Sequence, residues 1–133
     1  MDILVDSDII IDYLNNRNFA LSLVRKTVQN NKLFISVISW VEILYGFRKF
    51  KSIKKLKLFQ EFVMEFEIEI LPVDEKEAET YLDIKIDLEN QKIPLADFDL
   101  LIAGTAIANN LTLATRNTKH FNRIRGLKLK SVT

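Results

Sequence analysis

Several residue types are scarce or missing in this chain of 133 residues, and each absence excludes a kind of chemistry. There is no cysteine, so disulfides, thiolate metal sites and thiol nucleophiles are excluded. His120 is the single histidine, which leaves little scope for histidine-based catalysis. Three glycines and two prolines exclude collagen-like and low-complexity sequences. Any chemistry must therefore depend on carboxylates, hydroxyl groups and metal ions.

Long hydrophobic runs are also missing, since none approaches the roughly 20 residues that a membrane-spanning helix needs. The N-terminus lacks the basic segment and cleavage site of a signal peptide, so we expect no membrane association and a cytoplasmic location. With 48% hydrophobic and 28% charged residues, the composition is typical of one globular domain, which we expect to span residues 1–133.

The net charge of +1 conceals a strong segregation of charge along the chain. Residues 47–60 and 116–130 each carry six basic residues and no acid, whereas residues 61–89 carry eleven acids and two lysines. Two basic stretches around an acidic one suit a polyanionic substrate near a metal site. Ordinary solvated helix faces would give the same pattern.

Short apolar runs alternate with stretches of helical periodicity along the whole chain. Strands are predicted near residues 3–5, 33–36, 69–73, 111–115 and 127–129, and helices near residues 7–14, 19–29, 39–47, 52–65, 75–91 and 97–109. This order predicts an α/β fold in which a mainly parallel sheet of four or five strands is flanked by helices. Ligands of such folds bind beyond the carboxyl ends of the strands, so functional residues should directly follow strands.

Polar side chains from four distant segments meet this condition. Acids follow the first strand, lie early in the helix after the second strand and open the helix before the fourth strand, and polar residues end the fourth strand: Asp6, Glu42, Asp97, Asp99, Thr115 and Asn117. Converging carboxylates repel one another unless a cation neutralises them, and oxygen ligands without histidine or cysteine select Mg²⁺ or Mn²⁺. Such ions activate water and stabilise phosphoryl displacement.

Each of these residues also has a purely structural interpretation. Ser7 is a plausible N-cap of the first helix, and Asp97 of the helix near residues 97–109. Ser39 and Glu42 fit a capping box, in which the Glu42 side chain would reach back to the Ser39 amide. Trp40 fits a core or interface position better than a base-stacking role, and His120 is expected on the surface.

Four segments taken in order resemble the PIN domain family, most closely its VapC-type toxins. They are ILVDSD at 3–8, ISWVEILYG at 38–46, DLLIAG at 99–104 and LATRN at 113–117. The resemblance covers essentially the whole chain and implies a metal-dependent ribonuclease that acts as the toxin of a toxin–antitoxin pair. The family usually has asparagine where this chain has Asp8, and many members have aspartate where it has Asn117.

The resemblance implies a role for most of the candidate residues. Asp6, Glu42 and Asp99 are expected to be catalytic, with Asp6 and Asp99 on the principal Mg²⁺ (or Mn²⁺) and Glu42 on a second ion or acting as general base. Ser7, Thr115 and Asn117 are expected to support them. Two further roles follow from position and not from the resemblance: Arg116, between Thr115 and Asn117, is expected to bind phosphate, and Asp97 is an additional candidate metal ligand outside the usual motif.

The resemblance also implies three partners, namely an RNA substrate, a cognate antitoxin and a second copy of the chain in a homodimer. Five phenylalanines exceed what one helix pair needs on a single face and could line a groove for the antitoxin or belong to the core: Phe47, Phe50, Phe59, Phe62 and Phe66.

Two other functions remain open from the sequence. One is a phosphohydrolase of the haloacid-dehalogenase kind, since Asp6 and Asp8 follow the first strand as its aspartate pair would, and Ser36 follows the second. The glycine expected after that pair is absent, however, and no convincing lysine follows. The other is a catalytically silent module that binds RNA or a protein partner.

Overall fold

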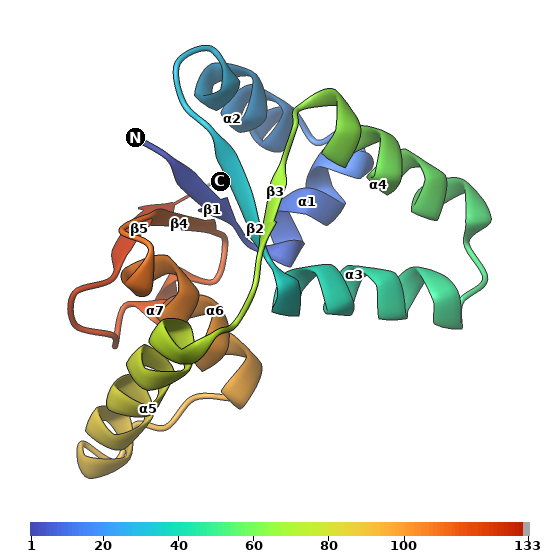
Figure 1. Cartoon of the computed structure of the whole chain (residues 1–133). Coiled ribbons are helices and arrows are strands. Elements are labelled where there is room, and N and C mark those ends of the chain that lie inside the picture. Colours follow the sequence, from blue (N-terminus) through green and yellow to red (C-terminus); the bar gives the residue numbers. More distant parts are fainter. Residues whose placement is uncertain (132–133) are drawn as a thin grey trace.

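Five parallel strands form one sheet with helices on both faces in the computed structural model, which describes residues 1–131 (Figure 1). The strands, in chain order, are β1 (Ile3–Val5), β2 (Leu33–Ser36), β3 (Glu69–Leu71), β4 (Thr112–Thr115) and β5 (Lys128–Ser131). Their order across the sheet is β3-β2-β1-β4-β5, and every neighbouring pair is parallel. The predicted α/β class is confirmed. The expected domain of residues 1–133 extends two residues beyond the described part.

Seven helices connect these strands within residues 1–131. They are α1 (Ser7–Leu14), α2 (Asn18–Val28), α3 (Val37–Lys49), α4 (Ile53–Glu65), α5 (Glu75–Asn90), α6 (Asp97–Ala108) and α7 (Thr118–Phe121). None of these helices has the length and hydropathy of a membrane-spanning segment.

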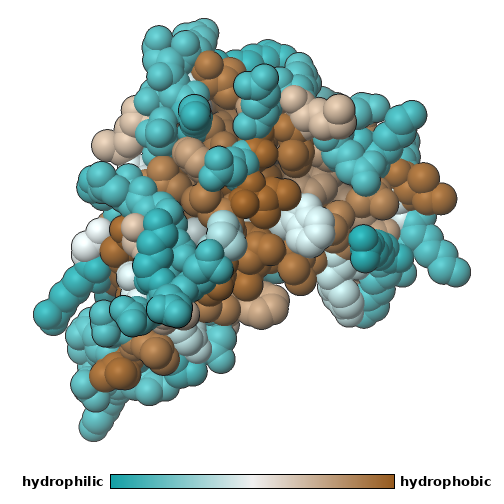
Figure 2. Space-filling view, viewed as in Figure 1, coloured by the Kyte–Doolittle hydropathy of each residue, from teal (hydrophilic) through white to brown (hydrophobic). Residues whose placement is uncertain are grey.

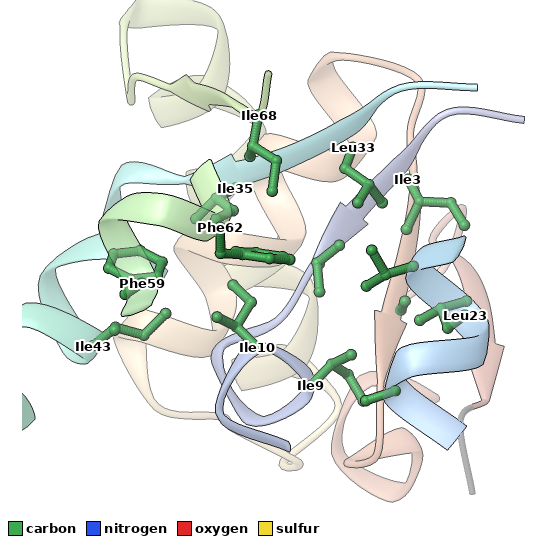
Figure 3. Packing of buried hydrophobic residues seen from close by; sticks show 14 of the residues in the cluster. Ile3, Ile9, Ile10, Leu23, Leu33, Ile35, Ile43, Phe59, Phe62 and Ile68 are labelled. Carbon is green, nitrogen blue, oxygen red and sulfur yellow. The ribbon is translucent and has the colours of Figure 1, made fainter. Parts of the chain in front are cut away.

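Two hydrophobic cores lie on opposite faces of the sheet, because successive side chains of a strand point to opposite sides. In β1, Ile3 and Val5 join a core with α1, α2, α3 and α4, whereas Leu4 joins one with α5, α6 and α7. Figure 3 shows the first core, where Phe59 and Phe62 from α4 pack near Ile10. Burial on both faces explains why the strands read as continuous apolar runs.

Three helix starts differ from the sequence-based prediction. Asp6, not Ser7, is the N-cap of α1, and its side chain accepts a hydrogen bond from the Ser7 amide. Helix α3 begins at Val37, with Ser36 as its cap, so Glu42 lies too deep in the helix for the capping box suggested with Ser39. Helix α6 is preceded by Ala96, without a side-chain cap from Asp97. Glu42 and Asp97 are therefore not needed to cap their helices.

The sheet order creates a point where the chain changes direction. From the central strand β1 the chain moves outward to β2 and β3, and it then crosses to β4 and β5 on the other side. In open α/β sheets, ligands bind in the crevice beyond the carboxyl ends of the two strands at such a switch point. Here those strands are β1 and β4, which end immediately before Asp6 and at Thr115.

Candidate functional site

Asp6 is the most buried acid at this switch point, with 7% of its surface exposed. Its backbone amide donates to the Ala114 carbonyl, which ties the end of β1 to β4. One carboxylate oxygen accepts from the Ser7 amide at 2.8 Å and the other from the Thr115 hydroxyl at 2.8 Å. Burial and the neighbouring Asp8 raise the pKa of Asp6 to about 7, despite these two hydrogen bonds. The position of Asp6 therefore disfavours its charged form in the absence of a cation.

Glu42 approaches from α3 and is linked to the same place. The Ser7 hydroxyl donates to Glu42 Oε1 at 3.3 Å, so one serine connects the start of α1 to α3. Burial raises the pKa of Glu42, and the negative charges of Asp99 and Asp8 raise it further. Four carboxylates, from the end of β1, the first turns of α1 and α6 and the interior of α3, thus act on one another.

Asp8 is a further acid of this group, in the first turn of α1. Its Oδ2 accepts from the Arg116 amide at 3.2 Å, whereas its Oδ1 is buried without a hydrogen-bond partner within residues 1–131. Burial raises the pKa of Asp8, and the hydrogen bond and charge of Arg116 oppose this increase. A buried carboxylate oxygen without a donor is a position that a cation can satisfy.

Asp99 lies in the first turn of α6, and its neighbour is the single histidine. Asp99 Oδ2 is 3.8 Å from His120 Nδ1, and that nitrogen is 2.8 Å from the Asn117 side-chain amide. The Asn117 backbone amide in turn donates to the Thr115 hydroxyl at 3.0 Å. His120 is half-exposed, as expected for a surface residue, and it lies beside the candidate site, which only the fold reveals.

Two other candidate residues have partners of their own. Asp97 Oδ1 is 2.8 Å from Lys85 Nζ and accepts from the Tyr81 hydroxyl at 2.8 Å, and these contacts lower its pKa. No contact links its carboxylate to Asp6, Glu42 or Asp99 within residues 1–131. The Arg116 side chain is paired with Asp12, a buried acid that sequence reasoning did not single out.

The donor types at this site fit a hard divalent cation. The nearest side chains offer carboxylate, hydroxyl and amide oxygens, which Mg²⁺ and Mn²⁺ prefer. Within residues 1–131, no three histidine, aspartate or glutamate side chains already converge closely enough to hold a metal ion. Burial and mutual repulsion of the carboxylates raise the pKa values of Asp6 and Glu42. A bound cation would oppose both effects, because it favours the charged form of each carboxylate.

Comparison with known proteins agrees with this fold. The family model described as PIN domain matches residues 3–127. The chain is 33% identical over 128 residues to Ribonuclease VapC1 of Methanocaldococcus jannaschii, a match that covers 96% of this chain and 85% of that protein. It is 29% identical to the tRNA(fMet)-specific endonuclease VapC of Shigella flexneri, over 94% of this chain and 93% of that protein.

Solved structures give the same assignment. The VapBC2 complex of Rickettsia felis, bound to a DNA fragment from its promoter, contains a chain that matches with a TM-score of 0.90 and 28% identity. That match covers 100% of both chains. DNA-bound VapBC of Salmonella typhimurium matches with a TM-score of 0.86 over 98% of both chains, and at 23% identity it supports the fold alone. The chain therefore belongs to the PIN domain family and, within it, to the VapC ribonucleases.

Proposed function

We propose that this protein is an endoribonuclease that depends on a divalent cation and acts as the toxin of a toxin–antitoxin pair. The observation that carries the proposal is the group of mutually repelling acids at the β1–β4 switch point, formed by Asp6, Asp8, Glu42 and Asp99. Uncompensated carboxylates would repel a phosphate backbone, whereas the same carboxylates around a cation attract and activate it. The ribonuclease names of the relatives support the choice of RNA as substrate.

Asp6 and Asp99 would hold the principal Mg²⁺ (or Mn²⁺), and Glu42 would hold a second ion or act as general base. When bound, such an ion lowers the pKa of water and stabilises the charge that develops on the phosphate. The raised pKa of Glu42 makes its carboxylate a stronger base than an ordinary glutamate, which suits a group that accepts a proton at Oε1 or Oε2. The Ser7 hydroxyl, at 3.3 Å from Oε1, orients this carboxylate.

The end of β4 supplies the supporting residues. The Thr115 hydroxyl donates to Asp6 and accepts from the Asn117 amide, so it fixes both the acid and the loop. Asn117 holds His120 through its side-chain amide. Arg116, whose side chain is 49% exposed, would bind a phosphate of the substrate. We assign no metal-binding role to Asp97, because Lys85 and Tyr81 occupy its carboxylate.

A hydrophobic groove between α3 and α4 is the surface best suited to the cognate antitoxin. It consists of a cavity of about 410 Å³ between α3 and α4 and an adjoining cavity of about 470 Å³ that is lined by α3 alone, Tyr45 included. The two cavities share Trp40, Leu44 and Arg48 in their walls. Figure 2 shows hydrophobic side chains that cross the middle of one face of the molecule toward this helix pair. Trp40 and Val41 directly precede Glu42 in α3, so a protein bound here would lie close to the site.

The phenylalanines predicted to line such a groove divide between core and surface. Phe47, Phe59 and Phe62 are buried in the first core, and Phe66 packs partly buried against it. Phe50 is 78% exposed at the turn between α3 and α4. Solved VapBC toxin–antitoxin complexes that contain similar chains support an antitoxin partner for this protein.

Cleavage of total RNA by the purified protein tests the proposal. We expect cuts with Mg²⁺ or Mn²⁺, none with EDTA, and none from Asp6→Asn under any condition. Asp83→Asn, which removes the same charge from an exposed position of α5, should cut as the wild type does. Intact RNA after incubation of folded, metal-bound wild type would contradict nuclease activity and favour the silent binding module.

Hydrolysis of a phosphomonoester in place of RNA would instead favour the phosphohydrolase. The fold already weakens that alternative, because the Ser36 hydroxyl is fully buried and accepts from the Ile38 amide as the cap of α3. A hydroxyl committed to a helix start is not available to a substrate phosphate.

A further inference from the structure

The loop that follows β4 is attached to α1 by three successive polar contacts. The Thr115 hydroxyl donates to Asp6, the Arg116 amide donates to Asp8, and Arg116 Nε lies 2.8 Å from Asp12 Oδ2. Asp8 and Asp12 are four residues apart and therefore share one face of α1. The backbone and the side chain of Arg116 are thus both held by the same helix face.

The Asp12–Arg116 pair has an unusual distribution of burial. The Asp12 side chain is 11% exposed, whereas that of Arg116 is 49% exposed. The contact is an ion pair without the direction of a hydrogen bond, since Asp12 Oδ2 has no hydrogen-bond partner within residues 1–131. Burying a carboxylate against a half-exposed arginine gives little net stability, because desolvation of the acid offsets the attraction. The pair therefore matters more for the orientation of the Arg116 side chain than for the stability of the fold.

The contact with Asp12 leaves the end of the guanidinium group available. Asp12 occupies the Nε side of the Arg116 guanidinium. Within residues 1–131, neither Nη1 nor Nη2 of Arg116 donates a hydrogen bond. Two parallel N–H groups at this end match two oxygens of a phosphate. Arg116 also lies at the border of the acid cluster, because its charge and amide both act on Asp8.

We propose that Asp12 is a positioning residue, which orients the Arg116 guanidinium so that its two terminal amino groups bind a phosphate of single-stranded RNA next to the acid cluster. The inference rests on the proposed function for the nature of the substrate. It adds a residue outside the candidate metal ligands, and it acts through Arg116 without contact with the reacting atoms.

Binding of RNA without cleavage provides the test, and its failure is distinguishable from failure of the nuclease proposal. The probe is a fluorescently labelled, mixed-sequence RNA 12-mer, titrated in EDTA and followed by anisotropy at several salt concentrations. We expect Arg116→Ala to weaken binding by about three- to tenfold. It should also reduce by about one the slope of the logarithm of the binding constant against the logarithm of the salt concentration. Asp12→Asn should weaken binding nearly as much.

The sign of the Asp12→Asn effect separates positioning from simple electrostatics. Loss of a negative charge should by itself tighten RNA binding, so Asp83→Asn on α5 is the matched control and should bind as well as the wild type or better. In the Arg116→Ala background, Asp12→Asn should have no further weakening effect. Wild-type or tighter binding by Asp12→Asn, or additive losses in the double variant, would overturn the proposal.

A second variant covers the case in which Asp12→Asn does not fold. Arg116→Lys changes a half-exposed side chain and keeps the positive charge, but lysine lacks the planar group that Asp12 orients. We expect this variant to bind the 12-mer as weakly as Arg116→Ala. Full binding by Arg116→Lys would show that charge alone suffices and would overturn the role of Asp12.

Discussion

Asp6 is subject to two opposing effects, one that favours its charged form and one that disfavours it. As the cap of α1 it must accept a hydrogen bond from Ser7, which favours the charged form. As a buried neighbour of Asp8 it resists ionisation, and burial is the stronger effect because the pKa rises from 3.8 to about 7. A bound cation would favour the charged form of such a side chain.

Replacement of Asp6 by asparagine should abolish RNA cleavage yet make the protein more stable. A pKa raised on folding means that the native state holds the proton more tightly, so stability falls as pH rises from about 4 to 7. Asp6→Asn removes this loss, and we expect a gain of about 1–3 kcal/mol above pH 7 in EDTA and little difference at pH 4. Urea denaturation at the two pH values measures it.

Added Mg²⁺ serves as the control for that measurement. Ligands that bind the native state stabilise it, so Mg²⁺ should raise the unfolding midpoint of the wild type and not that of Asp6→Asn. Lower stability of Asp6→Asn at pH 8 in EDTA would mean that the carboxylate serves the fold and not a cation.

The rate of cleavage should depend on pH in a direction set by the same group. Below about pH 7 the Asp6 proton competes with the cation, so at limiting Mg²⁺ the rate should rise with pH and level off above about 7.5. Saturating Mg²⁺ should move the midpoint to lower pH, because the cation then displaces the proton. Initial rates on one RNA from pH 5.5 to 8.5 provide the measurement, and a flat profile at limiting Mg²⁺ would contradict this assignment of Asp6.

At the scale of the elements, the close packing of α5 against α6 depends on Gly104, which has no side chain. A Cβ at Gly104 would lie 3.0 Å from the Tyr81 backbone nitrogen and 3.1 Å from the Glu77 carbonyl oxygen. Backbone atoms cannot move aside as a flexible side chain can, so the two helices would have to separate. The glycine therefore sets the distance between α5 and the helix that carries Asp99.

We expect Gly104→Ala to destabilise the protein by about 1–3 kcal/mol, although alanine is the better helix former. Gly46→Ala in α3 is the matched control, because a Cβ there meets no atom within 4 Å and should be neutral or stabilising. Thermal unfolding of the two variants measures the difference. Equal stability would show that α5 and α6 adjust to the extra methyl group.

Elements were the part of the fold that the sequence predicted best. Strands such as Ile3–Val5 and Leu33–Ser36 are short apolar runs that end just before or at a polar residue, and their parallel pairing follows from alternation with helices. Helix starts were less predictable, because several polar residues compete for each cap, as Asp6 and Ser7 do at α1. The short helix α7 has no periodicity that a pattern could reveal.

Acids that follow strands were predictable from the same pattern, whereas their partners were not. Asp12 and His120 reach the site through contacts across more than 20 residues of sequence, with Arg116 and Asp99 respectively. Local spacing carries no information on such pairs. Asp97 shows the reverse case, since its position two residues before Asp99 suggested a ligand but its side chain faces Lys85.

At the scale of the whole molecule, the groove between α3 and α4 is the surface best suited to binding a protein partner. Leu44→Asp would introduce a charge at a position that is 8% exposed, so the more exposed Tyr45, at 62%, is the better site for a test. We expect Tyr45→Asp to weaken binding of the cognate antitoxin by at least about tenfold without loss of thermal stability.

Calorimetric titration of the antitoxin into each variant measures this, with Leu82→Asp as the comparison, because Leu82 is 51% exposed on α5 and lies outside the groove. Unchanged affinity of Tyr45→Asp would exclude the outer face of α3 from the interface. Light scattering on the isolated chain, at several concentrations, tests the expected homodimer separately, and a monomer at every concentration would contradict it.

The central position of β1 determines when, during synthesis of the chain, the proposed site can form. Asp6 is made first, but its other neighbours belong to α3, α6 and the end of β4, which leave the ribosome much later. β4 must pair with β1 before Thr115 reaches Asp6, so no fragment that ends before β4 can form the proposed site. On that proposal, a nascent chain would not cleave RNA until almost its full length has emerged and folded.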